Sequence, residues 1–159
     1  MWTGWASLAL ASCCGLYAMQ QHHDDGLLAQ AGNAATLAAS MALYRDAVVH
    51  YAHQHPGFVG KVREADLSLP DWYVAPEPGL WSNHVRGDGL IAVYATRLPR
   101  VDIGAEVAAL AQGSELAGRA DRARDTIAPS AHAGAGIALP AIPGAAVPDG
   151  APVWLAHRY

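Results

Sequence analysis

The first 23 residues of this 159-residue chain contain no Lys, Arg, Asp or Glu, and the first charged side chain is Asp24. A helix over residues 2–19 would be about 27 Å long, close to the roughly 30 Å of hydrocarbon in a bilayer. Tryptophans lie at one end of it and a tyrosine at the other, where aromatic rings favour the headgroup level. Its strongest polar side chains are Ser and Thr, so it lacks the polar face of a soluble helix. We therefore predict a transmembrane anchor over residues 1–21 and a folded domain over residues 22–159.

Two other interpretations of this segment stay open. A cleaved secretory signal needs a basic stretch before its apolar stretch, and only the α-amino group is present here. Residues 10–13 resemble a bacterial lipobox, which would make Cys13 the lipid-modified first residue of the mature protein. The first basic residue, Arg45, is too far from the segment to set its orientation by the positive-inside rule.

Small side chains recur every four residues along the predicted anchor: Thr3, Ser7, Ala11 and Gly15. In a bilayer such a face lets two helix backbones approach closely, so it is a candidate membrane helix interface. The alternative is composition, because about half of this segment is small and such a ladder arises often by chance.

Composition limits what the domain after the anchor does. About 135 residues are enough for one domain. The net charge is −4, and the only basic cluster, residues 119–124, is interleaved with aspartates, so we expect no nucleic-acid binding. The only cysteines are Cys13 and Cys14, so the domain has no disulfide and depends on its apolar core.

The pattern of residues 26–57 is typical of one long amphipathic helix. Apolar side chains recur along it at steps of three and four: Leu37, Met41, Tyr44, Val48 and Tyr51. The adjacent Pro56 and Gly57 predict its end.

The rest of the chain predicts a small sheet and a second helix. Residues 80–98 look like two strands around a tight Arg-Gly-Asp-Gly turn, where glycines supply positive φ. Residues 102–116 are expected to form a helix with Asp102 as its N-cap. Residues 128–152 are expected to be extended, turn-interrupted chain laid on the domain, and residues 152–158 a last strand. The predicted class is α+β, with an N-terminal transmembrane helix and then a long helix packed on a small antiparallel sheet.

Catalytic motifs of the HExxH, GxSxG, Walker A and CxxC types do not occur in the sequence. Ser82, Asn83 and His84 are adjacent, but in a strand the serine and histidine point to one side and the asparagine to the other. No acidic residue is spaced to orient the histidine. We therefore predict no catalytic residues and no enzymatic activity.

Histidines are the main candidates for metal binding. Residues 22–25 are His-His-Asp-Asp, but consecutive residues on one helix or strand cannot converge on one ion. His50, His53 and His55 lie at the end of the long helix, where exposed polar residues are common. We predict no metal site and no cofactor.

The densest aromatic cluster consists of Trp72, Tyr73 and Trp81. Such residues pack in cores against helices, and they also anchor protein interfaces. We treat these three as a candidate partner-binding patch, with core packing as the alternative.

Several short motifs, taken in order, are similar to those of the PilM family of type IV (thin) pilus biogenesis proteins. They are YRDAV at 44–48, PGFVG at 56–60, LSLPDW at 67–72, WSNHV at 81–85, SELAG at 114–118 and LPAIPG at 139–144. The likeness covers nearly the whole chain, although each motif is short.

The resemblance implies a single-pass inner-membrane protein with a periplasmic domain, acting in a pilus basal body or in pilin transport. It implies other pilus-assembly proteins as partners and no catalytic role, and it carries over no functional residue. A minor pilin or pseudopilin is the nearest alternative, although it would need a Glu five residues into the mature helix. A lipid-anchored periplasmic binding protein and a small secreted hydrolase are the alternatives from other classes.

Overall fold

The computed structural model describes residues 30–129 and 136–158. The chain divides into two compact units, Met1–Asn33 and Ala34–Tyr159. All the elements discussed below, apart from the first residues of the long helix, belong to the second unit.

The predicted anchor over residues 1–21 lies outside the described residues, and so does Cys13. The candidate interface of that anchor lies outside them as well: Thr3, Ser7, Ala11 and Gly15. Among the helices that are described, none is both long enough and apolar enough to cross a bilayer. The anchor therefore stays a prediction from the sequence.

The long helix covers residues 30–54 of the described chain, within the range predicted from the apolar stripe. Four stripe residues are buried, and Tyr51 at its end is half-buried: Leu37, Met41, Tyr44 and Val48. The helix ends just before Pro56, because the residue before a proline is pushed away from the helical conformation. The predicted helix, its buried face and its end are confirmed within the described range.

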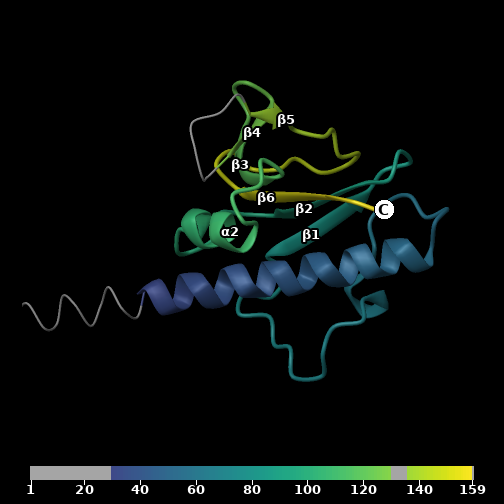
Figure 1. The fold of residues 1–159 in the computed structure, drawn as a ribbon, viewed down its shortest axis with the longest axis horizontal. Coiled ribbons are helices and arrows are strands. Elements are labelled where there is room, and N and C mark those ends of the chain that lie inside the picture. Colours follow the sequence, from purple (N-terminus) through teal and green to yellow (C-terminus); the bar gives the residue numbers. More distant parts are fainter. Residues whose placement is uncertain (1–29, 130–135, 159) are drawn as a thin grey trace, which may run out of the picture. The chain divides into compact units, whose positions relative to one another are not determined.

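Eight further elements follow the helix: η1 (Glu64–Asp66), β1 (Trp81–Val85), β2 (Leu90–Ala95), α2 (Gly104–Leu110), β3 (Ala117–Asp121), β4 (Thr126–Pro129), β5 (Ile137–Ala138) and β6 (Pro152–His157). The strands form one six-stranded antiparallel sheet in the order β1-β2-β6-β3-β4-β5. The fold is therefore α+β with a long helix and an antiparallel sheet, as predicted (Figure 1).

Strands β1 and β2 form the predicted hairpin around the Arg-Gly-Asp-Gly turn. Gly89 in that turn has φ +86°, a conformation that glycine adopts without steric cost. Ile91, Val93 and Ala95 alternate along β2 and are fully buried. Val93 lies opposite Asn83, whose side chain bonds Tyr44 of the long helix, so these three residues lie on the helix side of the sheet. The main core forms there, between the long helix and the sheet (Figure 1).

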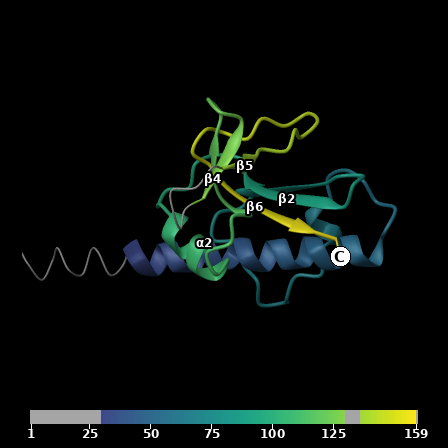
Figure 2. The same cartoon turned by 45° about the horizontal axis from the view of Figure 1, so that its top comes forward.

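The opposite face of the sheet is covered by the segment between β5 and β6 (Figure 2). Leu139 and Val147 of this segment are buried. Near β6 it is fixed to β3, because Gly150 N–H donates to Ala120 O at 2.8 Å and Ala120 N–H donates to Ala151 O at 2.9 Å. In its described residues this is the predicted extended chain laid on the domain.

The second helix is shorter than predicted. The sequence analysis placed it over residues 102–116, whereas α2 ends at Leu110. The chain turns there because Gln112 and Gly113 have φ of 53° and 71°, values that no α-helix continues through. Asp102 lies one position before the cap residue, yet its Oδ1 accepts the N–H of Gly104 at 2.9 Å, a capping role like the one predicted.

Candidate partner-binding loop

The segment joining η1 to β1 lies against the long helix on the side away from the sheet, as Figures 1 and 2 both show. We call residues 70–80 the Trp72 loop. Its sequence, PDWYVAPEPGL, contains three prolines and a glycine, and this composition favours turns over regular structure. A turn forms at its start, where Tyr73 N–H donates to Pro70 O at 2.8 Å.

Side chains in the middle of this loop alternate between solvent and protein. Trp72 is 71% exposed and Val74 is 81% exposed. Tyr73 between them is half-buried, and its phenol hydrogen-bonds with Ser40 of the long helix. Burial raises the pKa of Tyr73, and the Ser40 hydrogen bond partly opposes this. The loop thus presents two large apolar side chains outward while the tyrosine holds it to the helix.

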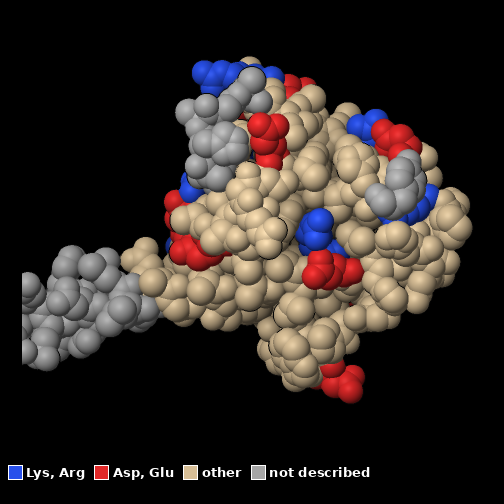
Figure 3. Space-filling model, viewed as in Figure 1, with Lys and Arg blue, Asp and Glu red and all other residues tan. Residues whose placement is uncertain are grey.

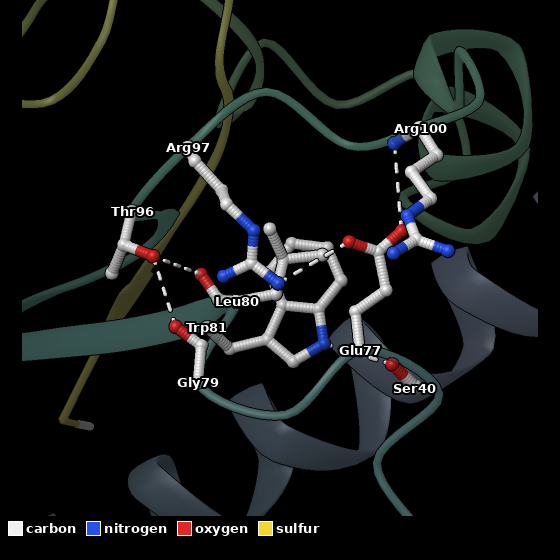
Figure 4. A network of polar contacts seen from close by, with 8 residues as sticks. All are labelled: Ser40, Glu77, Gly79, Leu80, Trp81, Thr96, Arg97 and Arg100. Carbon is white, nitrogen blue, oxygen red and sulfur yellow. Dashed lines mark hydrogen bonds and ion pairs between the residues drawn. The ribbon is translucent and has the colours of Figure 1, made fainter.

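The end of the loop is fixed by Trp81, the first residue of β1. Trp81 is only 7% exposed, and its indole Nε1 donates to Ser40 Oγ at 2.8 Å (Figure 4). Ser40 therefore contacts both aromatic side chains, Tyr73 and Trp81. Of the three candidate patch residues, Trp72 is on the surface, Tyr73 is half-buried and Trp81 lies in the core.

Backbone contacts to the end of β2 also hold the loop. Thr96 Oγ1 donates to Gly79 O at 2.9 Å and to Leu80 O at 3.2 Å, and Thr96 N–H donates to Leu80 O at 2.8 Å. These bonds fix the last two loop residues against the sheet (Figure 4).

Glu77 adds a charged contact in the second half of the loop. Its carboxylate accepts from Arg97 Nη2 at 3.4 Å and from the backbone N–H of Arg100 at 3.4 Å. The Glu77 side chain is 14% exposed, whereas that of Arg97 is 50% exposed. This pair reaches from the loop to the chain that follows β2, so both sides of the loop base are held (Figure 4).

An exposed indole on a loop with a fixed base is suited to protein binding. Tryptophan is enriched among the residues that contribute most to interface affinity. A loop that is already ordered loses less conformational freedom when a partner binds. The arrangement offers an apolar anchor and no reactive group.

The candidate Ser-Asn-His cluster does not form a catalytic arrangement. Ser82 and His84 lie on the sheet face away from the long helix, whereas the Asn83 side chain bonds Tyr44 and Val62 on the helix side. Burial, and secondarily the charge of Arg86, lower the pKa of His84. No acidic side chain among the described residues hydrogen-bonds this histidine.

The helix-end histidines make local contacts. His50 Nε2 lies 2.9 Å from Gln54 Nε2, and His55 stacks on Tyr51 with ring centroids 4.1 Å apart. Within residues 30–129 and 136–158, no three side chains of His, Cys, Asp or Glu gather in a metal-binding arrangement. The run at 22–25 lies outside these ranges.

Comparison with known families decides the relationship. The PilM family model matches residues 9–155, nearly the whole chain. This chain belongs to the PilM family. Membership indicates a role connected with type IV pili, and it makes other pilus proteins plausible partners.

A solved structure shares this fold. A crystal structure described as a PilM protein from Escherichia coli B7A matches with a TM-score of 0.53 and 22% sequence identity. The match covers 80% of this chain and 94% of the other, so the two share a fold over most of their length. No curated protein matches the chain.

Surface charges of this PilM-family domain are mixed. On the face shown in Figure 3, basic and acidic side chains are scattered and often adjacent, and most of the face is uncharged. The arginines of the basic cluster each pair with an aspartate: Arg119 with Asp102, Arg122 with Asp125, and Arg124 with Asp121. The interleaving seen in the sequence and the longer-range Asp102 contact both neutralise this cluster.

Sequence reasoning missed three residues of the Trp72 loop site. Val74 extends the exposed apolar surface, and Ser40 and Glu77 hold the loop. Val74 sits among prolines and adjoins Tyr73. This sequence context is the one signal that marks Val74 as a loop residue. Ser40 gives no such signal, because it is one small residue in an Ala-rich helix.

Proposed function

We propose that this PilM-family protein is a non-enzymatic component of the inner membrane in a type IV (conjugative thin) pilus assembly apparatus. It acts in the basal body or in pilin transport. In this proposal residues 1–21 form a single-pass anchor and residues 22–159 form a periplasmic domain. Family membership supports the pilus role, and the uncharged N-terminal segment supports the anchor.

The observation that carries the binding role is the Trp72 loop. Trp72 and Val74 are the two most exposed large apolar side chains of the described residues. Contacts through Tyr73, Glu77 and Trp81 hold the loop in place. We infer that this loop docks on the periplasmic part of another pilus-assembly protein, with the indole as the main anchor.

The polar residues that resemble a catalytic group have another role or lack a necessary partner, which supports a non-enzymatic function. Asn83 holds the helix to the sheet, and His84 has no acidic partner among the described residues. A hydrolase would need a base oriented by a third group beside its nucleophile.

Loop substitutions test the binding role. Trp72→Ala combined with Val74→Ser should leave the amount of folded protein unchanged but reduce piliation and co-purification with other pilus-assembly proteins. A matched control is Val59→Ser combined with Leu98→Ala, since both of these side chains are 58% exposed and lie outside the loop. If the loop variant forms pili as well as the control, partner binding does not use this loop.

Membrane fractionation tests the anchor separately. An intact Met1 in protein that resists carbonate extraction supports a retained span, and Cys13→Ser should leave the protein membrane-bound. Release by Cys13→Ser would indicate a lipid anchor instead. Recovery of the protein in sheared pili, and not in the cell envelope, would indicate a minor pilin.

A further inference from the structure

The Trp72 loop belongs to a stretch of chain that contains no cation. Residues 64–85 include no Lys or Arg, and they include four acidic residues: Glu64, Asp66, Asp71 and Glu77. In Figure 3, which has the view of Figure 1, the part that projects below the long helix shows acidic residues and no basic ones. The exposed indole therefore lies in a negatively charged part of the surface.

Two of these four carboxylates are already paired within the protein. Asp66 accepts two hydrogen bonds from Arg63, at 2.7 Å and 2.9 Å. Glu77 pairs with Arg97 at the base of the loop, where Arg100 also lies (Figure 4). The negative charge before the loop and at its base is thus balanced by the chain's own arginines.

The carboxylate at the tip of the loop is not balanced in this way. Tyr73 N–H donates to Pro70 O and closes a turn whose two central residues are Asp71 and Trp72, so the carboxylate and the indole lie at the same corner. Asp71 and Glu64 are exposed, and neither forms an ion pair with a basic side chain of the described residues. After burial, the charge of Glu64 also raises the pKa of Tyr73, which places Glu64 close to the loop.

An exposed indole beside an unpaired carboxylate attracts a cation. The face of an aromatic ring carries partial negative charge, and a cation within about 6 Å of the ring centroid is held there. Trp72 is 71% exposed, so most of its ring is open to such a contact. Arginine suits this corner better than lysine, because its flat guanidinium stacks on a ring and can donate two hydrogen bonds to a carboxylate.

We propose that the Trp72 loop binds a segment of its partner that presents an arginine. The guanidinium lies over the Trp72 indole and pairs with Asp71, and Val74 packs against an apolar side chain next to that arginine. This inference rests on the proposed function, because it names the chemistry of the partner at the same loop. A second copy of this chain is poorly suited to the role, since every arginine of the described residues except Arg100 either pairs with an acid or is buried.

A peptide titration tests the chemistry of the partner. The probes are N-acetyl-Gly-Leu-Arg-Gly amide and the same peptide with citrulline, which has nearly the shape of arginine and no charge. Each is added to the purified full-length chain, and the indole N–H signals are followed by NMR; that of Trp72 is assigned from its absence in Trp72→Phe. We expect the arginine peptide to shift the Trp72 signal and the citrulline peptide to bind about tenfold more weakly. Added salt should weaken binding of the arginine peptide.

Variants connect that binding to the corner of the loop. Asp71→Asn keeps the shape of the side chain but removes its charge, and it should weaken binding of the arginine peptide by about three- to tenfold. Trp72→Leu keeps an apolar side chain but removes the ring, and it should have an effect of about the same size, read from the Val74 signals. Asp125→Asn is the matched control, because Asp125 is 77% exposed and lies outside the loop, next to β4. It should bind as the unsubstituted chain does.

Three results of the titration would overturn the proposal. One is the absence of any shift with the arginine peptide at millimolar concentration. Another is equal binding of the arginine and citrulline peptides, or unchanged binding by Asp71→Asn, either of which would show that the charge is not recognised. The third is a Trp72 signal that shifts when the protein alone is concentrated, which would assign the loop to a second copy.

Pilus counts separate a failure of this inference from a failure of the proposed function. Asp71→Arg should reduce piliation, as Trp72→Ala combined with Val74→Ser should. If only the double variant loses pili, the loop still docks on a partner and the inferred arginine is wrong. If both variants form pili normally, the proposed binding role of the loop is wrong as well.

Discussion

Asn83 Nδ2 donates a 2.8 Å hydrogen bond to the hydroxyl of Tyr44. The same amide nitrogen donates to Val62 O at 3.0 Å, and Asn83 Oδ1 accepts from Val62 N–H at 2.8 Å. Asn83 is fully buried, and both of its amide protons are used. One side chain of β1 thus joins the sheet to the long helix and to the segment that follows it.

Asn83→Ala should lower the free energy of unfolding by about 2–4 kcal/mol, because it leaves the Val62 backbone groups unpaired in the interior. Tyr44→Phe removes only one of the three bonds and should cost about 0.5–1.5 kcal/mol. Urea denaturation of the full chain measures both. Equal losses would mean that the Val62 contacts add nothing.

Alkaline pH should destabilise the protein through the same tyrosine. Burial raises the pKa of Tyr44 to about 12, against the opposing effect of the Asn83 hydrogen bond. The unfolded chain loses this proton near pH 10, so between about pH 10 and 12 the folded state binds more protons than the unfolded state. Stability should therefore be unaffected by Tyr44 below pH 10 and should fall as pH rises through this window. Urea midpoints measured at several pH values should fall less steeply with rising pH for Tyr44→Phe than for the unsubstituted protein. An equal fall in the two proteins would contradict this prediction.

The elements that the sequence predicted are those with local patterns. The apolar stripe of the long helix and the glycine turn between β1 and β2 are both visible within short windows of sequence. Strands β3 and β4 show no such pattern. Their sequences, AGRAD and TIAP, are short and rich in Ala and Gly, and β3 pairs with β6, in which Pro152 lies opposite Arg119. The paired residues, 117–119 of β3 and 152–154 of β6, are far apart in the sequence, so their pairing depends on the whole fold.

At Gly118 the backbones of β3 and β4 approach too closely for a side chain. A Cβ added there would fall inside the contact distance of the Ala128 carbonyl on the neighbouring strand. Gly118→Ala should push the two strands apart and cost about 1–3 kcal/mol, as overpacking does elsewhere. A denaturation midpoint measures this loss. Gly57→Ala is the matched control, because a Cβ at that position has open space around it; equal effects would contradict the close approach.

Arg158 should stabilise the end of the long helix. Its guanidinium donates to Pro56 O and, at 2.7 Å, to Phe58 O. Arg158→Ala leaves these carbonyls without their donor and should cost about 1.5–3 kcal/mol. Faster amide exchange around Phe58, together with a lower urea midpoint, would show the loss. Arg124→Ala, at a cation that is 79% exposed, should change stability by less than about 0.5 kcal/mol.

The candidate site could be predicted only in part, and its two tryptophans show the reason. Trp72 and Trp81 are nine positions apart and belong to one aromatic cluster in the sequence. Which of them is buried depends on Ser40, a residue 41 positions before Trp81 whose hydroxyl accepts the indole N–H. No local pattern contains that contact, so the sequence could not separate the surface tryptophan from the core one.

Those two tryptophans should therefore respond in opposite ways to the same substitution. Trp81→Ala opens a cavity beside the long helix and leaves Ser40 without its donor, so it should cost about 3–5 kcal/mol. Trp72→Ala removes a side chain that is mostly in solvent, and it should change stability by less than about 0.5 kcal/mol while reducing piliation. Urea denaturation of the two purified variants measures the change in stability. Counts of pili on cells that express each variant measure piliation. If Trp72→Ala also unfolds the protein, its indole stabilises the fold and the piliation loss says nothing about a partner. Trp72→Phe then separates the effect on stability from the effect on binding. A phenyl ring that restores stability but not piliation would still assign the indole to partner binding.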